Sequence, residues 1–341
     1  MSELKLSIIM PAYNAEETIE ASIQSVLSSE SDCFELIVIN DGSKDSTEEI
    51  IKSFSDARIK YIKKQNSGVS DTRNYGLNMA KGEYITFIDS DDCYTDKAVD
   101  KLIGYIEQYS ADILAFGFYR EFIENNKVFK TEANAVSHVI SFDLKNGEEY
   151  LQYIYRSSHI LFQTSWNKVF KRDIMLKNGI KFNKNLVCYE NLTMVLDYLK
   201  YAKNAVFIND ILYRYNIFTD SKVNVLSKRN KLELTSDVAE CYKKFVELCD
   251  KFDYSFEYRT FMNKAFLDDF VYCSRKYFEK SEKYTSKQRF DAFCKYLYDE
   301  NFLILRKDYL RYTKFYRLLY LFSDHGLKHI AYKMYEKKLI K

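Results

Sequence analysis

The sequence predicts an α/β protein with a doubly wound, mostly parallel sheet, followed by a mainly α-helical C-terminal region. Within residues 1–120, short apolar runs alternate with segments whose apolar residues recur at the helical period. Polar turn sequences follow the apolar runs, and from residue 228 onward Gly and Pro are absent over long stretches. We therefore expect one α/β domain over residues 1–227, with halves at 1–120 and 121–227, and a helical addition over 228–341.

The first elements alternate between strand and helix. Leu6–Met10 is a short apolar strand that Pro11 is expected to stop, since proline lacks the N–H that a strand ladder uses. Glu16–Leu27 has its apolar residues on one face at the helical period, which predicts a helix. Glu35–Ile39 is a second buried strand, and the acidic start of Asp45–Phe54 predicts the next helix.

The same alternation continues to residue 118. The expected elements are a strand at Ile59–Ile62, a helix at Ser70–Ala80, a strand at Tyr84–Ile88, a helix through Val99–Ile106 and a strand at Ile113–Phe118. Helices between successive strands are typical of parallel crossover connections. Beyond residue 120 the pattern is mixed, with a short hairpin expected at Glu124-Asn125-Asn126-Lys127.

The composition is that of a soluble globular protein. Hydrophobic residues make up 47% of the 341 residues and charged residues 29%, which excludes a disordered chain. The net charge of +2 gives no reason to expect nucleic-acid binding. The seven cysteines are scattered without a C-x-x-C pair, which favours reduced thiols. With neither a signal peptide nor an apolar run of about 18 residues, we expect a cytoplasmic protein.

The most informative stretch is an acidic turn. Asp89, Asp91 and Asp92 directly follow the apolar run Tyr84–Ile88. A strand interior does not accommodate three ionised carboxylates, because each costs several kcal/mol without a partner. The turn is therefore expected at the sheet edge where ligands bind in open α/β folds. Carboxylates at this spacing suit a hard divalent cation. The alternative is an acidic turn that caps the next helix, and this stretch alone leaves both open.

Polar motifs stand at successive strand ends and helix starts. They are Pro11-Ala12-Tyr13-Asn14, Asn40-Asp41-Gly42-Ser43, Asn66-Ser67-Gly68-Val69-Ser70 with Arg73-Asn74-Tyr75-Gly76, Gly82-Glu83-Tyr84 and Asp89-Ser90-Asp91-Asp92. Over residues 4–95 their order and spacing resemble the family 2 glycosyltransferases, whose motifs include P-x-Y-N, D-D-G-S, N-x-G-x-S-x-x-R-N-x-G and D-x-D-D. A weaker match at Trp166–Arg172 extends the resemblance toward residue 200. The resemblance implies an inverting enzyme with a GT-A fold, of the bacterial cell-surface glycan or glycoprotein type.

The resemblance further implies a nucleotide-sugar site made of Pro11, Tyr13, Asn14, Asp41, Arg73, Asp89 and Ser90. Tyr13 offers an aromatic face to the base. Asp41 can accept a hydrogen bond from a uracil imide or a ribose hydroxyl, and Arg73 can donate to the base or the pyrophosphate. The alternatives are that Tyr13 packs, that Asp41 caps a turn and that Arg73 pairs with Asp71 or Glu83.

A metal and a catalytic base are also implied. Asp91, with Asp89, is the expected ligand of Mn²⁺ or Mg²⁺, which neutralises charge on a departing diphosphate. Inversion needs a carboxylate that takes the proton of the acceptor hydroxyl, and family members usually place it in a Glu-Asp pair after the Trp-Asn-Lys segment. This chain has Glu190 followed by Asn191, whose amide accepts no proton near neutral pH. The open alternatives are Glu190 as base, Asp92 as base, or weak or absent transferase activity.

Three further features have competing explanations. Trp166, the only tryptophan, is either a floor for an acceptor sugar or a core residue. His325 and His329 are four apart, and a surface helix is favoured over a metal site. Residues 306–341 carry ten Lys and Arg against three acidic residues, interleaved with aromatics. This segment is a solvated helix face, a homodimer or intramolecular contact, or a peripheral contact with an anionic membrane.

These observations lead to a functional expectation. We expect a metal-dependent glycosyltransferase that moves a hexose or N-acetylhexosamine, with inversion, from a UDP-sugar to a glycan, lipid-linked or glycoprotein acceptor. The alternative is a catalytically silent paralogue that binds nucleotide sugar and supports a partner transferase. A nucleotidyltransferase is disfavoured, because no Gly-rich phosphate loop follows the first strand.

Overall fold

The computed structural model describes residues 3–144, 163–219 and 234–255, with further short stretches at 147–149, 152–153, 161, 258–259, 266, 285, 287–288 and 290–291. The chain forms two compact units. The first comprises Met1–Asn185 and Glu190–Val225, and the second comprises Leu186–Tyr189 and Leu226–Lys341. The assignment of Leu186–Tyr189 to the second unit departs from the sequence-based division after residue 227, which itself stays a prediction.

Within the described residues, the first unit is built on a ten-stranded mixed sheet. The main path runs β3 (Ile59–Lys63), β2 (Phe34–Asn40), β1 (Leu6–Ala12), β4 (Tyr84–Phe87), β9 (Lys168–Lys171), β6 (Ile113–Glu124), β10 (Asn204–Phe218) and β5 (Cys93–Tyr94). Strands β1 to β4 are parallel, as are β6 and β10, whereas β9 runs antiparallel to both β4 and β6. The predicted doubly wound, mostly parallel fold is confirmed.

The first strand does not stop at Pro11, contrary to the prediction. β1 continues to Ala12 and pairs with β2 along its whole length, with Pro11 opposite Ile39. On its other side, the pairing with β4 ends at Ile9, opposite Phe87. Pro11 therefore lies where the β4 neighbour has already ended, so that its missing N–H removes no ladder bond on that side.

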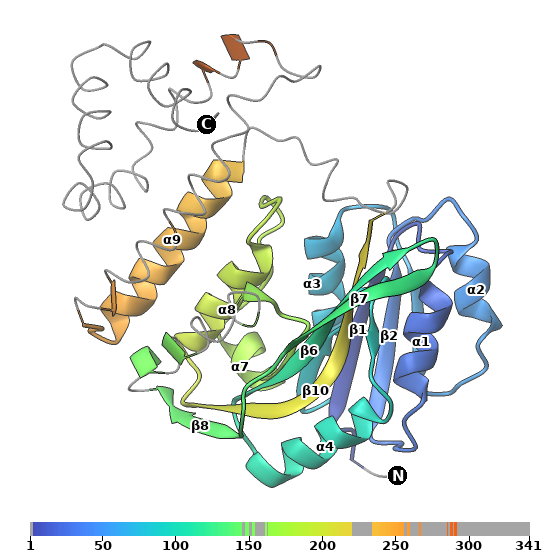
Figure 1. Ribbon diagram of the computed structural model, residues 1–341, viewed down its shortest axis with the longest axis horizontal. Coiled ribbons are helices and arrows are strands. Elements are labelled where there is room, and N and C mark those ends of the chain that lie inside the picture. The colour runs from blue at the N-terminus through green and yellow to red at the C-terminus, as the bar shows by residue number, and fades with distance from the viewer. Residues whose placement is uncertain are drawn as a thin grey trace. The chain divides into compact units, whose positions relative to one another are not determined.

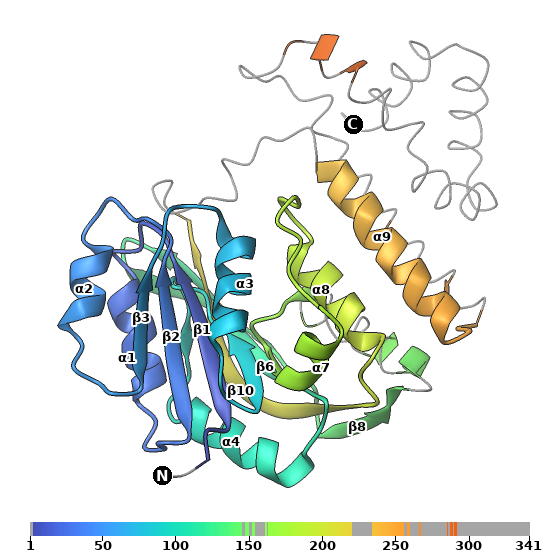
Figure 2. The ribbon, with the colours of Figure 1, turned by 180° about the vertical axis from the view of Figure 1, so that it is seen from behind.

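The described helices up to residue 109 lie close to their predicted positions, whereas α7 (Arg172–Lys177) was not predicted from the sequence. In the first unit the described helices are α1 (Ile19–Leu27), α2 (Thr47–Ser53), α3 (Val69–Met79), α4 (Ala98–Tyr109), α7 and α8 (Glu190–Leu199). α1 begins three residues later than Glu16, because Thr18 and Ile19 donate to the carbonyl of Ala15 in a preceding turn. α1 and α2 cover one face of β1–β3 and α3 covers the other (Figures 1 and 2), as right-handed crossovers require.

Two additional strands extend the sheet. β7 (Lys127–Asn134) pairs with β6, and β8 (Ile140–Asp143) pairs with β10. β6 and β7 are joined through Asn125 and Asn126, whose φ angles of 49° and 57° suit a tight hairpin turn. The predicted hairpin is confirmed.

The second unit contains helix α9 (Leu234–Lys251). Asp237, in its first turn, is 3% exposed and accepts hydrogen bonds from the backbone N–H groups of Val187 (2.7 Å) and Cys188 (2.9 Å). These bonds account for the grouping of Leu186–Tyr189 with α9. No helix among the described residues is long and apolar enough to cross a membrane. The predictions on His325, His329 and residues 306–341 fall outside the described residues.

Candidate active site

The candidate site lies at the carboxyl edge of the parallel strands. β1 leads to Tyr13, β2 leads to Asp41 and β4 leads to Asp89. Because β1 lies between β2 and β4, the order of connection along the chain reverses at this point of the sheet. This is the crevice in which ligands bind in open α/β sheets.

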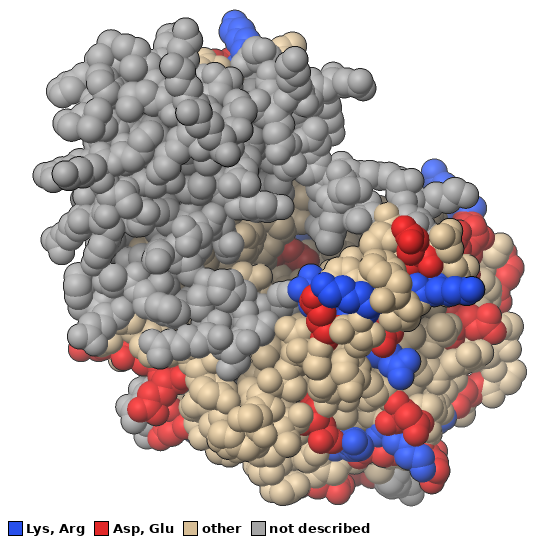
Figure 3. All heavy atoms as spheres, viewed as in Figure 1, with Lys and Arg blue, Asp and Glu red and all other residues tan. Residues whose placement is uncertain are grey.

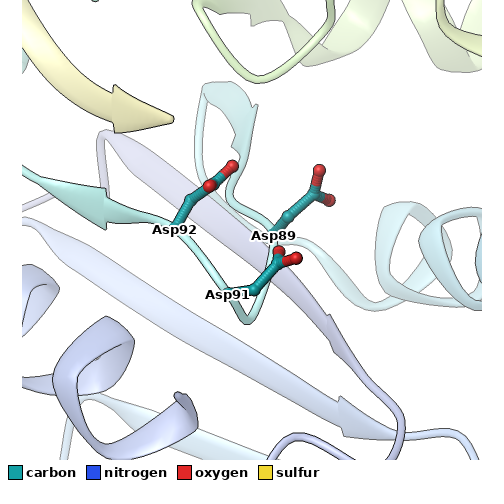
Figure 4. Close-up of side chains that lie close together, drawn as sticks. All are labelled: Asp89, Asp91 and Asp92. Carbon is teal, nitrogen blue, oxygen red and sulfur yellow. The ribbon is translucent and has the colours of Figure 1, made fainter. Parts of the chain in front are cut away.

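The acidic turn brings three carboxylates together. Each of Asp89, Asp91 and Asp92 offers an oxygen within 4.8 Å of those of the other two, and all three project from the turn after β4 (Figure 4). The turn is held by Ser22 of α1, whose hydroxyl contacts the carbonyls of Ser90 (2.9 Å) and Asp92 (2.6 Å). The sheet and α1 thus place three carboxyl groups in one small volume.

The Asp92 side chain is buried in the protein interior. It is 1% exposed, and its carboxylate accepts hydrogen bonds from the Tyr213 hydroxyl (2.7 Å) and the Asn216 backbone N–H (2.8 Å), both on β10. Burial, with the charges of Asp91 and Asp89, raises the pKa of Asp92 well above its ordinary value. These contacts favour a role in fixing the turn to β10, and the alternative of Asp92 as catalytic base stays a prediction.

The surroundings of Asp91 differ from those of Asp92. Asp89 and Asp91 are accessible to solvent, and no side-chain donor reaches the Asp91 carboxylate within the described part of the chain. Partial desolvation by the surrounding protein, together with the charge of Asp89, raises the pKa of Asp91 to about 6. A divalent cation would compensate this charge, and an all-oxygen donor set suits Mg²⁺ or Mn²⁺. Asp91 and Asp89 therefore fit the predicted metal ligands.

Arg73 connects the acidic turn to the start of α8. Its guanidinium is 3% exposed and donates from Nη2 to Asp89 Oδ1 at 2.5 Å. Nη1 lies 3.4 Å from Asn191 Oδ1 and 3.6 Å from Glu190 Oε1. Arg73 also lies over the ring of Phe182, 5.3 Å from its centroid. The structure therefore pairs Arg73 with Asp89 and Glu190 instead of the alternatives weighed from the sequence, Asp71 and Glu83.

Glu190 and Asn191 begin α8, which lies beside α3 (Figure 2). Asn191 Nδ2 donates to Glu190 Oε1 at 3.0 Å, and Asn191 Oδ1 accepts from the Ser165 hydroxyl at 2.5 Å. The Glu190 side chain remains 13% exposed. Glu190 is thus a carboxylate with solvent access, held by an arginine and an amide. This arrangement can orient a general base.

The residues expected to meet the base of a nucleotide differ in exposure. Tyr13 is 48% exposed at the end of β1, so its ring is available for stacking. Asn14 has a φ of 48°, and its side chain accepts from the Lys44 backbone N–H at 2.9 Å, which ties this turn to the turn after β2. Pro11 is buried within β1, and Ser90 is partly accessible in the acidic turn.

Asp41 is committed to the neighbouring loop. It is 3% exposed and accepts from the backbone N–H groups of Ser67 (3.0 Å) and Gly68 (2.9 Å) and from Lys64 Nζ (2.5 Å). Gly68 precedes α3 with a φ of 91°, which glycine adopts without strain. Asp41 thus fixes the loop that leads into α3 and Arg73. Its predicted contact with a nucleotide stays a prediction.

Trp166 packs in the core. It is 4% exposed, and its ring stacks on those of Tyr213 (4.5 Å between centroids) and Tyr215 (5.4 Å). Phe118 meets it edge to face at 4.8 Å. Trp166 therefore supports the tyrosine that holds Asp92, in agreement with the core alternative, and its predicted contact with an acceptor sugar stays a prediction.

Sequence reasoning missed four residues that hold the site together, namely Ser22, Ser165, Tyr213 and Asn216. Ser22, Tyr213 and Asn216 lie between 68 and 125 residues away from the residues with which they form hydrogen bonds, and the elements that carry them contain no motif. Ser165 is nearer to its partner, since it lies 26 residues before Asn191. Tyr213 is one of 30 tyrosines, and nothing in the local sequence distinguishes it. The only sequence feature that could have indicated a role for one of these four residues is the position of Ser165 directly before Trp166.

Comparison with known proteins identifies the class. The family described as "Glycosyl transferase family 2" matches residues 7–178, about half of the chain. The poly(ribitol-phosphate) β-N-acetylglucosaminyltransferase TarP of Staphylococcus aureus is 30% identical over 248 residues, which cover 70% of this chain and 71% of TarP. The chain therefore belongs to glycosyl transferase family 2.

Other relatives agree with this assignment. The glycosyltransferase GlyA of Streptococcus pneumoniae is 30% identical over 240 residues, covering 66% of this chain but only 32% of GlyA, so the match spans about a third of that relative. The crystal structure of S. aureus TarS 1–349 in complex with UDP-GlcNAc superposes with a TM-score of 0.72 at 18% identity, covering 98% of this chain and 90% of that structure. This likeness shows the GT-A fold.

Proposed function

We propose that the enzyme transfers a hexose or N-acetylhexosamine from a UDP-sugar to a hydroxyl of a glycan, lipid-linked or glycoprotein acceptor, with inversion and with Glu190 as the base. The observation that carries the proposal is the position of Arg73 between Asp89 and Glu190. One side chain there contacts both the acidic turn, where a diphosphate would lie, and the carboxylate that would face the acceptor. The UDP-GlcNAc bound in the TarS crystal structure and the sugar in the name of TarP support the donor class.

The reaction requires one proton transfer and one substitution. The acceptor oxygen forms a bond to the anomeric carbon while the bond from that carbon to the UDP oxygen breaks. Glu190 takes the proton of the acceptor hydroxyl. Attack from the face opposite the leaving UDP inverts the anomeric configuration. Asn191 and Arg73 hold the Glu190 carboxylate in place through the contacts at 3.0 Å and 3.6 Å.

Asp91 and Asp89 would hold Mn²⁺ or Mg²⁺ in this proposal. When bound, such a cation supplies Lewis-acid stabilisation of the negative charge on the departing diphosphate. Tyr13 would stack on the uracil ring with its exposed face. Arg73 would keep Asp89 oriented, because its guanidinium is buried and donates directly to that carboxylate.

The biological setting is part of the same proposal. Several relatives carry names from cell-wall polymer synthesis, among them TarP and the minor teichoic acid biosynthesis protein GgaB of Bacillus subtilis. We therefore propose that this enzyme acts in bacterial cell-surface glycan assembly, in the cytoplasm, with peripheral membrane contact or dimerisation through the C-terminal region as further proposals.

The test compares Glu190→Gln with wild type in a UDP-release assay with a panel of UDP-sugars and Mn²⁺. We expect turnover to fall about 100- to 10,000-fold, since the general base is lost, while the Kd for UDP stays within about twofold of wild type. Glu49→Gln, at an exposed position of α2, serves as the matched control. Unchanged turnover in Glu190→Gln would refute the base assignment.

A second candidate function rests on Asn191. An amide stands where the family usually has its catalytic aspartate, which is what a silent paralogue would show. In that case the wild-type protein binds UDP but releases no UDP from any donor sugar. The Glu190→Gln variant then shows no further loss, because there is no turnover to lower. The same assay therefore separates the two candidates.

A further inference from the structure

A cavity of about 440 Å³ opens beside the candidate active site. One wall is the outer face of α3, with Asn74, Tyr75 and Asn78, and the other is the segment 181–185, with Lys181 and Lys184. All of these residues belong to the first unit. None of them has a role in the donor site described above.

The two walls are fastened to each other. Asn74 Nδ2 donates to the Phe182 carbonyl, and the Phe182 backbone N–H donates back to Asn74 Oδ1, both at 2.8 Å. Phe182 is 2% exposed and packs edge to face on Phe87 of β4 at 5.0 Å. These contacts fix the position of the segment 181–185 relative to α3, and so fix the separation of the two walls.

The same wall reaches the active site. The Phe182 ring lies against the Arg73 guanidinium, 5.3 Å from its centroid. Arg73 in turn lies 3.6 Å from Glu190, the proposed base. The buried side chains of Phe182 and Arg73 thus lie between this wall of the cavity and the carboxylate that would receive the acceptor proton. The cavity therefore lies close to the proposed base.

The lining offers groups that bind a hydroxyl-rich, anionic chain. Tyr75 is 42% exposed and stacks on no other ring of the described structure, so its face is available to a sugar or polyol. Lys181 and Lys184 are exposed, and within the described residues neither forms an ion pair. The one acidic residue of the lining, Asp71, is already engaged by Ser67 at 2.5 Å and Lys64 at 3.6 Å.

Lys181 and Lys184 are distinguished by their shared position, since both line this cavity. On the described part of the face in Figure 3, Lys and Arg side chains are interspersed with Asp and Glu. Some exposed lysines elsewhere are paired, as Lys97 is with Glu30 at 3.1 Å and Lys177 with Asp173 at 2.9 Å. Others, such as Lys44 and Lys127, form no ion pair among the described residues. Lys184 also acts on Asp71 through its charge and helps to lower the pKa of that carboxyl. The two lysines nevertheless outnumber the single acidic residue of the lining, and this excess of positive charge attracts a ligand that brings its own negative charge.

We propose that this cavity is a subsite for the acceptor, and that the acceptor is a hydroxyl-rich chain carrying phosphate or carboxylate groups. This inference rests on the proposed transferase function. Lys181 and Lys184 contact the anionic groups, Tyr75 stacks on the repeating unit, and the amides of Asn74 and Asn78 flank its hydroxyls. The chain end then lies next to Glu190.

The test measures binding of three polymer probes to the full-length protein by isothermal titration calorimetry. The probes are poly(glycerol phosphate), polygalacturonate and neutral dextran of similar length. We expect wild type to bind at least one anionic probe and to bind dextran at least about tenfold more weakly. The stronger of the two anionic probes identifies phosphate or carboxylate as the charged group. Equal binding of dextran, or no binding of any probe, would overturn the proposal.

Variants locate the binding to the cavity. Lys181→Ala with Lys184→Ala is expected to weaken binding of the anionic probe about tenfold or more and to flatten its salt dependence, because two charge-assisted contacts are lost. The control removes two paired lysines outside the cavity, Lys97→Ala with Lys177→Ala, and should leave binding within about twofold. Equal losses in the two double variants would show general charge attraction and would overturn the subsite.

The Kd for UDP with Mn²⁺, measured on the same samples, separates this inference from the proposed function. The cavity variants should retain wild-type UDP binding, because no cavity residue contacts the acidic turn within the described structure. Failure of wild type to bind UDP would refute the donor site, whereas loss of polymer binding with UDP binding intact reports on the cavity alone. Tyr75→Ala, which removes the stacking face and leaves the charge unchanged, is expected to weaken binding about threefold or more.

Discussion

Asn191 Nδ2 donates a hydrogen bond to Glu190 Oε1 at 3.0 Å, so the residue that replaces the family's usual aspartate supports its neighbour. The amide cannot take a proton, but it fixes one carboxylate oxygen of Glu190. Ser165 fixes the amide from the other side, through a hydrogen bond of 2.5 Å to Asn191 Oδ1. The substitution therefore moves the candidate base by one residue and retains a polar partner for it.

Asn191→Asp tests this relationship. A second carboxylate next to Glu190 would compete for Arg73 and raise the pKa of one member of the pair. With Glu190 as base, we expect turnover at pH 7 to fall about tenfold and the acidic limb of the rate profile to move to higher pH. The measurement is kcat for UDP release between pH 5 and pH 9.

Asn125→Asp is the matched control for that variant. It makes the same change in the tight turn between β6 and β7, where a φ of 49° is tolerated by Asp as well as Asn. Turnover that increases in Asn191→Asp would contradict the proposal, because position 191 would then be the better base.

The acidic turn gives a prediction about metal binding. Asp91 has no side-chain donor within the described structure, whereas the Asp92 carboxylate is bonded to Tyr213 and Asn216. We expect Asp91→Asn to weaken Mn²⁺ binding in the presence of UDP by at least about tenfold, since a charged ligand is lost. Asp92→Asn should weaken it less than about threefold.

Calorimetric titration with Mn²⁺ between pH 5 and pH 8 measures these affinities. Because the pKa of Asp91 is raised to about 6, a proton competes with the metal below that pH, and wild-type affinity should weaken as the pH falls through 6. An equal loss in the two variants would place Asp92 among the ligands.

The fold was largely readable from the sequence because its strands and helices have strong local patterns. Strands such as β2 are buried along their whole length and appear as continuous apolar runs. β9 could not be placed in this way. Only its pairing with Tyr84 to Thr86 of β4 and with Ile113 to Ala115 of β6 inserts it antiparallel between them, and those contacts join residues more than 50 positions apart.

The site was predictable where motifs follow strand ends, and not where a side chain acts from a distant element. The grouping of Asp89, Asp91 and Asp92 was visible in the sequence, and the structure brings their oxygens within 4.8 Å. The difference in burial among the three carboxylates was not visible in the sequence. It depends on Tyr213 and Asn216, more than 120 residues away, which bury one carboxylate and leave the others accessible.

Tyr213→Phe tests the cause of that difference through stability. The hydroxyl donates to Asp92 at 2.7 Å, and the ring stacks on Trp166 with centroids 4.5 Å apart. Phe keeps the stacking and leaves the buried carboxylate short of a donor, so we expect the free energy of unfolding to fall by about 1–3 kcal/mol. Tyr215→Phe is the control, because Tyr215 also stacks on Trp166 but does not hydrogen-bond to Asp92. Urea denaturation at pH 7 measures both, and equal effects would contradict the assigned role.

Glu35 anchors the start of β4, and its substitution should change how stability depends on pH. The side chain is 3% exposed and accepts from the Ser7 hydroxyl (2.6 Å) and the Lys81 backbone N–H (2.7 Å), and it pairs with Lys60. Burial acts to raise the pKa of Glu35, but the hydrogen bonds from Lys60, Ser7 and Lys81 outweigh it and hold the pKa below the ordinary value of 4.5. A lowered pKa in the folded state means that the ionised form stabilises the fold above pH 4.5, and that this contribution is lost as the pH falls through the folded-state pKa.

Glu35→Gln removes that contribution. At pH 7 we expect the variant to be less stable than wild type by about 1–3 kcal/mol, since hydrogen bonds to a charged group are lost. The free energies of unfolding of the two proteins should begin to converge as the pH falls below about 4.5 and should meet once the pH has passed through the lower folded-state pKa, where wild-type Glu35 is neutralised as well. Urea midpoints measured from pH 3 to pH 8 report the difference, with exposed Glu49→Gln as the control. A difference of the same size at pH 3 and pH 7 would show that the loss comes from packing, and the electrostatic account of this anchor would be wrong.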